Sequence, residues 1–171
     1  ETGTTFEANA TIKALAYCAA LGKPCMADDS GLEIDALDGR PGVISSHYAT
    51  DGRETGATRE QRDLANNARV LRELQGVPSE YRSARFRCVI VLAVPGRGVV
   101  ATASGSFEGR IGLPPDVPRG GHGFGYDPLF LVPPNYTASS SELTPAEKNA
   151  RSHRGAAARE MANSLRSLRF D

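Results

Sequence analysis

Runs of residues bounded by helix start and stop signals predict helices near both ends of the chain and after residue 58. Each run opens with the Ser/Thr-x-x-Glu/Gln spacing of a capping box, at Thr4–Glu7, Thr58–Gln61 and Thr144–Glu147. Glycine and proline terminate the first two runs, as is typical of helix C-termini. The predicted helices span Phe6–Leu21, Arg59–Leu74 and a stretch from near Ser152 to Leu168.

The middle of the chain has the patterns of strands. Ala84–Val94 is an almost continuous apolar run, typical of a central strand, and Pro95–Gly98 turns it back into Val99–Phe107 as an antiparallel hairpin. Shorter strands are predicted at Cys25–Ala27, Leu32–Asp35 and Pro128–Val132. Helices flanking a strand-rich middle predict an α/β domain with a mixed sheet.

Length and composition place the chain among ordinary globular proteins. Its 171 residues predict a single domain over 1–171, and 40% hydrophobic with 23% charged residues exclude disorder as the main state. The 20 basic and 20 acidic residues cancel. Because nucleic-acid binding depends on a net positive field, we expect no nucleic-acid partner, and any bound anion must be held locally.

The cysteines and the start of the chain predict a cellular location. Cys18, Cys25 and Cys88 are odd in number and widely spaced, so they predict buried thiols in a reducing compartment. No apolar run is long enough to span a membrane, and the first residues lack a signal-peptide pattern. We therefore expect a soluble, cytoplasmic protein with no membrane partner.

Two adjacent carboxylates are the sharpest local feature. Asp28 and Asp29 precede Ser30 and Gly31, and we expect the pair at the end of a strand. A buried carboxylate is costly unless it is paired or binds a metal. Mg²⁺ prefers one or two carboxylates with phosphate oxygens, and a carboxylate outside the metal shell can deprotonate water. A solvated turn is the alternative, since Asp, Ser and Gly favour turns.

A glycine-rich loop is the second feature. Leu113–Gly125 contains too many prolines and glycines for a regular element, and Gly120–Pro128 interleaves glycines with Phe124 and Tyr126. Such a loop presents backbone donors beside a stacking face, which suits a flat base. Asp127 would then accept from the base edge or fix the loop. The alternative is a turn whose aromatic rings fill the core.

The start of the last helix carries a cluster of basic residues. Lys148, His153 and Arg154 lie where a helix N-terminus presents unpaired N–H groups, which predicts an anion or purine-edge site. Lysine is scarce, with only Lys13, Lys23 and Lys148, so a compact ammonium at position 148 supports binding, although drift in composition also explains it.

Two other patterns say less about function. The glycines of Ser104–Gly109 predict a place where another backbone passes closely. A Ser-His-Asp hydrolase is excluded, because no Gly-x-Ser-x-Gly elbow follows a strand and opens a helix.

Taken together and in this order, five motifs resemble the inosine triphosphate pyrophosphatase family, over essentially the whole chain. The motifs are Glu1-Thr2-Gly3-x-Thr5-Phe6-x-x-Asn9-Ala10, Ala27-Asp28-Asp29-Ser30-Gly31-Leu32, Gly39-x-Pro41-Gly42-Val43, Gly123-Phe124-Gly125-Tyr126-Asp127-Pro128 and Lys148-Asn149-x-x-Ser152-His153-Arg154.

The resemblance implies hydrolysis of dITP, ITP and XTP to the monophosphate and pyrophosphate, with Mg²⁺, by a cytoplasmic homodimer. It implies an elongated mixed sheet flanked by helices in two lobes, with a substrate cleft between them. Asp29 matches the family's general base and metal-site carboxylate. The matching substrate contacts are Ser30, Phe124, Gly125, Tyr126, Asp127, Lys148, His153 and Arg154.

The sequence departs from the family pattern at its beginning. Family members have a strand, a Ser/Thr-x-Asn-x-x-Lys phosphate-binding turn and a helix before the segment that matches Glu1, and their metal-binding Glu lies at or just before it. We expect the 171 residues to lack these parts and to hydrolyse ITP slowly. The alternative is a non-catalytic nucleotide-binding or dimerisation module.

Overall fold

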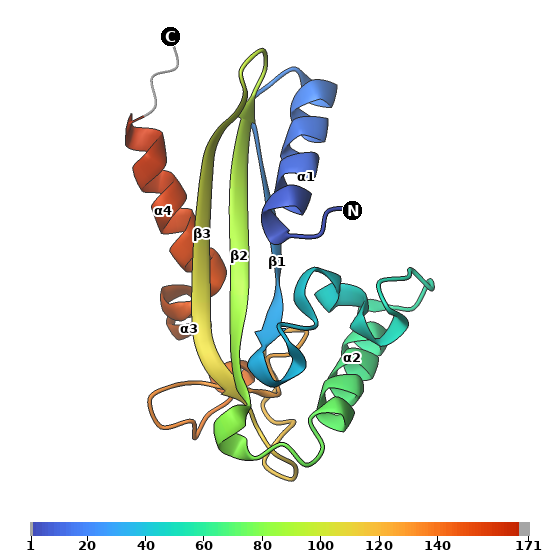
Figure 1. The fold of residues 1–171 in the computed structure, drawn as a ribbon. Helices are drawn as coiled ribbons and strands as arrows, with labels where there is room; N and C mark the ends of the chain where they lie inside the picture. Colours follow the sequence, from blue (N-terminus) through green and yellow to red (C-terminus); the bar gives the residue numbers. More distant parts are fainter. Residues whose placement is uncertain (1, 168–171) are drawn as a thin grey trace. The chain divides into compact units, whose positions relative to one another are not determined.

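The computed structural model describes residues 2–167, in which four strands form one sheet in the order β1-β2-β3-β4 (Figure 1). The strands are β1 Cys25–Ile34, β2 Ser83–Val94, β3 Gly98–Ile111 and β4 Phe130–Leu131. The α-helices are α1 Phe6–Leu21, α2 Arg59–Glu73, α3 Pro145–Arg151 and α4 His153–Ser167. Short 3₁₀ helices are η1 Asp35–Leu37, η2 Gly42–Thr50, η3 Ser79–Tyr81 and η4 Ser140–Glu142. The predicted α/β class is confirmed.

The prediction of two short strands around the acidic pair was wrong. Cys25–Ile34 is one continuous strand, so Asp28 and Asp29 lie in its middle rather than at a strand end. Composition alone favoured a turn there. In the fold, however, partners on both faces of β1 compensate the polar side chains, and the strand continues through them.

The C-terminal helix begins where it was predicted, near Ser152. α4 starts at His153, and the Oγ of Ser152 accepts a hydrogen bond from Gly155 N at 3.0 Å, which caps this start. The short helix α3, Pro145–Arg151, precedes it. The predicted end at Leu168 lies outside the described residues. The last strand is shorter than predicted and pairs antiparallel with β3, Ile111 opposite Phe130.

The chain divides into two compact units, and the three long strands contribute residues to both. The first unit contains Glu1–Ser30, Arg87–Phe107 and Ala150–Asp171. The second contains Gly31–Phe86 and Glu108–Asn149. The substrate cleft implied by the family resemblance stays a prediction.

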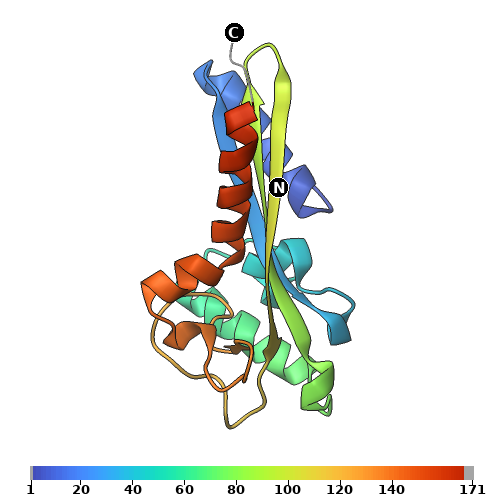
Figure 2. The same ribbon diagram turned by 90° about the vertical axis from the view of Figure 1, so that its left-hand side faces the viewer.

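In the first unit, α1 and α4 pack on opposite faces of the sheet. The buried residues of α1 are Asn9 and an apolar stripe of one residue per turn, which consists of Phe6, Ala10, Ala14 and Cys18. On the other face, Met161 of α4 packs with Leu92 of β2 and Ala103 of β3, and Figure 2 shows α4 running along these strands. The sequence of β2 is an almost continuous apolar run, and successive strand residues point to opposite faces of the sheet. Both faces of β2 are therefore apolar, as its sequence predicts.

The second unit packs α2 against η2 around a buried aromatic and aliphatic core. Phe86 of β2 and Phe130 of β4 have ring centroids 4.6 Å apart. Arg82 is 2% exposed, and its guanidinium donates to the carbonyls of Leu74, Val77 and Gly112 at 2.6–2.9 Å. One buried side chain thus provides hydrogen-bond donors for backbone carbonyls at the end of α2, in the turn that follows it and in the segment after β3.

Two further expectations concern the cysteines and membrane-spanning segments. The three cysteines are free thiols, as predicted, with Cys18 and Cys88 buried and Cys25 half-buried. None of the helices between residues 2 and 167 has the length and apolar character needed to cross a bilayer. The predicted cytoplasmic location stays a prediction.

The backbone approach predicted for Ser104–Gly109 is confirmed at two glycines. A Cβ on Gly105 would lie 2.3 Å from the carbonyl oxygen of His153 and 2.5 Å from Ala157 N, so β3 touches the backbone of α4. A Cβ on Gly109 would lie 2.6 Å from the carbonyl oxygen of Leu131 and 2.4 Å from the ring of Phe130.

We predict that Gly105→Ala lowers the free energy of unfolding by about 1–3 kcal/mol, the usual cost of overpacking, because the methyl group must displace the first turn of α4. Urea unfolding followed by circular dichroism measures the loss. Gly121→Ala is the matched control, since an added Cβ there meets nothing within 4 Å. Equal stability of the two variants would contradict the close contact.

Candidate functional site

The predicted site residues fall into two groups, one in each unit. Asp28, Asp29 and Ser30 on β1 belong to the first unit, together with His153–Arg154 at the start of α4. The second unit contains Phe124–Asp127 and Lys148. Each group is built by the elements of its own unit.

Asp29 faces α1 and is 8% exposed. Lys13 Nζ lies 2.8 Å from its Oδ1, and Asn9 Nδ2 donates to its Oδ2 at 3.3 Å. Asn9 and Lys13 are one helical turn apart, so both side chains leave α1 on the same side. Asn9 also accepts from Gly3 N at 2.8 Å, which fixes its amide. Lys13 thereby supplies the positive charge that a buried carboxylate requires.

Asp28 faces the opposite side of β1 and meets α4. Arg154 donates to its Oδ2 through Nη2 at 2.8 Å and Nε at 3.2 Å, and Ser30 Oγ donates to the same oxygen at 3.1 Å. Burial acts to raise the pKa of Asp28, but the hydrogen bond and charge of Arg154, with smaller effects of Ser30 and Lys13, leave the pKa below its ordinary value.

The two adjacent carboxylates therefore do not share one cation. Each points to its own face of β1 and has its own basic partner, Lys13 or Arg154. Among residues 2–167, no three His, Cys, Asp or Glu side chains are close enough to form a metal cluster. A buried carboxylate is nevertheless the ligand type that Mg²⁺ takes together with phosphate oxygens and water, so Asp29 fits as a single ligand. Glu1 lies outside the described residues.

His153 and Arg154 are the first two residues of α4. His153 is half-buried, and its carbonyl lies at the close approach of Gly105. The predicted role of both residues as substrate contacts stays a prediction. In the structure, Arg154 forms an ion pair with Asp28, and half of the Arg154 side chain is exposed.

In the second unit, Asp127 organises the glycine-rich loop. It is 4% exposed, and its Oδ2 accepts from Phe124 N at 2.9 Å and from Lys148 Nζ. Its Oδ1 accepts from Ser140 Oγ at 2.8 Å. One carboxylate therefore ties the loop to η4 and to α3. Of the two roles considered for Asp127, these contacts fit the one that fixes the loop.

The two aromatic residues of the loop differ in exposure. Phe124 is 53% exposed, and the guanidinium carbon of Arg59 lies 4.1 Å from its ring centroid, with Lys148 Nζ at 5.5 Å. Tyr126 is 4% exposed and donates its hydroxyl to the carbonyl of Ser45 at 2.7 Å, and burial raises its pKa. Phe124 therefore offers an accessible ring, whereas the ring of Tyr126 anchors the loop in the core.

A sequence model of the Ham1 family matches residues 1–164. The chain belongs to the Ham1 family. It is 52% identical over 162 residues to the dITP/XTP pyrophosphatase of Nitratidesulfovibrio vulgaris, a match that covers 94% of this chain and 74% of that protein. The motif resemblance drawn from the sequence is thereby confirmed.

Two solved Ham1 structures have the same fold. The Ham1 protein of Staphylococcus aureus superposes with a TM-score of 0.82 at 37% identity, covering 97% of this chain and 79% of the other. A HAM1 protein from Coxiella burnetii gives 0.81 at 42% identity, with 98% and 80% covered.

Sequence reasoning missed the partners that hold the predicted Ham1 site residues. Asn9 and Lys13 support Asp29, while Arg59, Asp63 and Asn67 of α2 contact the loop. One signal was available: a polar pair four residues apart on the buried side of an Ala-rich helix predicts a partner across the interface. The contacts of α2 join segments about 60 residues apart and left no local signal.

We predict that the pKa of the Asp28 carboxyl lies below its ordinary value of 3.8 and rises in Arg154→Met, where burial is no longer offset. Carbon-detected NMR titration of Asp28 measures both values. Because the folded pKa is lowered, the ion pair stabilises the fold above about pH 4 and is lost as pH falls through the folded pKa. Arg154→Lys keeps the charge and is expected to lie between the two; an unchanged pKa in Arg154→Met would contradict the pairing.

We predict that Lys148→Met lowers the free energy of unfolding by about 1–3 kcal/mol, because it leaves the buried Asp127 carboxylate without its cation. Urea unfolding measures the loss. Lys23→Met, which removes an exposed lysine after α1, is the matched control. Equal stabilities would show that Asp127 does not depend on Lys148.

Proposed function

We propose that this protein hydrolyses the non-canonical purine nucleoside triphosphates dITP, ITP and XTP to the monophosphate and pyrophosphate, with Mg²⁺. The 52% identity to a dITP/XTP pyrophosphatase, over 94% of the chain, carries the proposal. The reaction breaks the anhydride bond between the α and β phosphates, and water supplies the new oxygen on one product.

The first unit would supply the chemistry at the phosphates. Asp29 would hold Mg²⁺ and accept the proton of the attacking water, and the contacts of Lys13 and Asn9 with its carboxylate support this by fixing its orientation. Bound Mg²⁺ would neutralise charge on the phosphate oxygens. The imidazole of His153 and the guanidinium of Arg154 lie at the start of α4, where unpaired backbone N–H groups favour an anion.

The second unit would supply recognition of the base. The exposed ring of Phe124 offers a stacking face, and Gly125 contributes backbone groups beside it. Donors aimed at a 6-oxo group discriminate against adenine, because its 6-amino group leaves them unpaired in a desolvated site. The homodimer implied by the family resemblance stays a prediction.

We predict that ITP and dITP are hydrolysed faster than ATP in the presence of Mg²⁺, and that Asp29→Asn lowers kcat about 10²–10⁴-fold, the usual contribution of a general base. Pyrophosphate release measures turnover, and calorimetry of ITP measures binding, which the substitution is expected to preserve. Asp116→Asn, at an exposed loop carboxylate, is the control.

The outcomes separate the alternatives. ITP binding without turnover in the unmodified protein would favour the non-catalytic nucleotide-binding module. Retained turnover in Asp29→Asn would remove Asp29 from the proton-transfer and metal-binding roles. Equal rates with ATP and ITP would contradict selection of the 6-oxo base.

A further inference from the structure

Three residues of α2 form a continuous contact with the glycine-rich loop. Arg59, Asp63 and Asn67 are spaced four residues apart, so their side chains leave the helix on one side. All three contact Phe124 or Gly125. We call this set the α2 clamp.

The clamp holds both backbone polar groups of a single residue. Asp63 Oδ2 accepts from Gly125 N at 2.8 Å, and Asn67 Nδ2 donates to Gly125 O at 3.1 Å. Gly125 has φ of +63°, in the left-handed region. Fixing the N–H and the carbonyl together sets the orientation of both peptide planes that flank this residue.

The third member of the clamp acts on the ring. The Arg59 guanidinium lies over Phe124, and its Nε is 4.0 Å from Asp63 Oδ2. A guanidinium over an aromatic face is attractive, and Phe124 is still 53% exposed. Arg59 therefore restrains the ring whose backbone neighbour Asp63 and Asn67 restrain.

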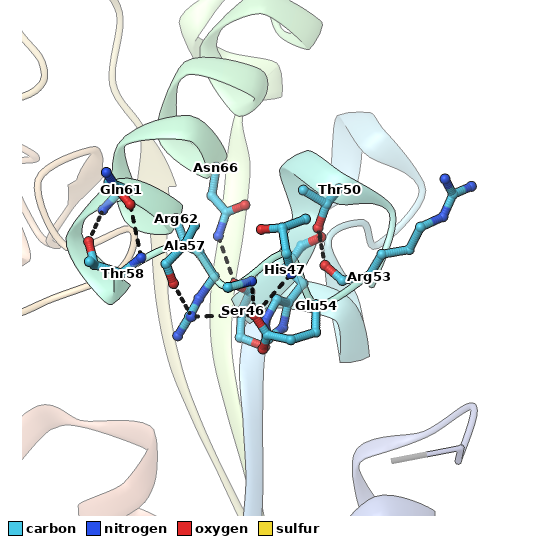
Figure 3. Close-up of polar contacts among 12 residues, drawn as sticks. Ser46, His47, Thr50, Arg53, Glu54, Ala57, Thr58, Gln61, Arg62 and Asn66 are labelled. Carbon is cyan, nitrogen blue, oxygen red and sulfur yellow. Dashed lines mark hydrogen bonds and ion pairs between the residues drawn. The ribbon is translucent and has the colours of Figure 1, made fainter.

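The helix that carries the clamp is itself firmly held, as Figure 3 shows for its N-terminal half. Thr58 and Gln61 form a reciprocal capping box. Asn66, on a different side of α2, is buried, donates to the carbonyls of Ser45 and Ser46 and accepts from Ala49 N at 2.7 Å. The clamp thus extends from a helix fixed to η2, while Asp127 holds Phe124 N from the interior.

We propose that Asp63 and Asn67 are positioning residues that hold Gly125, and with Arg59 the Phe124 ring, in the conformation that receives the purine base. This inference rests on the proposed function. A segment with glycines at 120, 121, 123 and 125 has a large conformational entropy, so an unclamped loop must be ordered when the nucleotide binds. Because the clamp orders the loop when the protein folds, this entropy is lost on folding and not on nucleotide binding.

The proposal makes a specific kinetic expectation. Contacts to the base are the same in the ground state and the transition state, since no bond of the base changes. Loss of such uniform binding raises KM and leaves kcat unchanged. We expect Asp63→Ala and Asn67→Ala each to raise KM for ITP about tenfold, corresponding to one hydrogen bond, with kcat within about twofold.

The test compares these variants with Glu60→Ala, which removes an exposed acidic side chain from the same helix. Steady-state pyrophosphate release gives KM and kcat, and hydrogen exchange monitored at the Gly125 amide reports the clamp without any nucleotide. Asp63→Asn retains an acceptor oxygen and is expected to recover part of the affinity and of the amide protection. Glu60→Ala is expected to match the unmodified protein.

Two failures are distinguishable. A fall in melting temperature and kcat with KM unchanged, or unchanged exchange at Gly125, would show that the clamp residues are merely structural and would overturn this inference alone. An unmodified protein that neither binds nor hydrolyses ITP would overturn the proposed function, and with it the assignment of the clamp to a purine base.

Discussion

Within each unit, the structure depends on one buried carboxylate and on the lysine whose positive charge compensates for its burial. Asp29 in the first unit and Asp127 in the second are nearly inaccessible, and each is paired with a lysine, Lys13 or Lys148. An isolated carboxylate in such a place would be strongly destabilising. The chain has only three lysines, and two of them serve this purpose.

Each pair determines which segments lie together. Lys13 requires the buried side of α1 to face β1, because its ammonium and the amide of Asn9 must reach the same carboxylate. In the second unit, Asp127 receives donors from its own loop, from Ser140 of η4 and from α3. The candidate catalytic carboxylate and the candidate base loop are thus held by the same kind of interaction.

The sequence predicted those parts of the fold whose signals are local. The helix over Phe6–Leu21 was predicted with its observed bounds, because start and stop signals act within a few residues of each end, although the N-cap is Thr5, which accepts from Ala8 N, and not Thr4. The strand through Asp28 and Asp29 was not predicted, because the turn-forming composition there is outweighed by ion-pair partners 16 and 126 residues away in the sequence. The last helix begins near Ser152, as predicted.

The candidate site shows the same division. Motifs identified residues such as Asp29 and Phe124 by type and order. Phe124 and Tyr126 both belong to the predicted base loop, but only packing, which no motif contains, decides that the Tyr126 ring is buried while the Phe124 ring is exposed. The supporting residues on α2 could not be predicted for the same reason, whereas Asn9 and Lys13 on α1 left a local signal in their spacing.

The opposite directions of Asp28 and Asp29 also bear on how β1 can change over evolutionary time. A substitution in this strand alters one face at a time, because neighbouring side chains contact different helices. A single-residue insertion or deletion would turn every following side chain to the other side of the sheet, so that Asp29 would be presented to Arg154 instead of Lys13. Lineages that retain this charge arrangement should therefore vary in the residues of β1 while conserving its length.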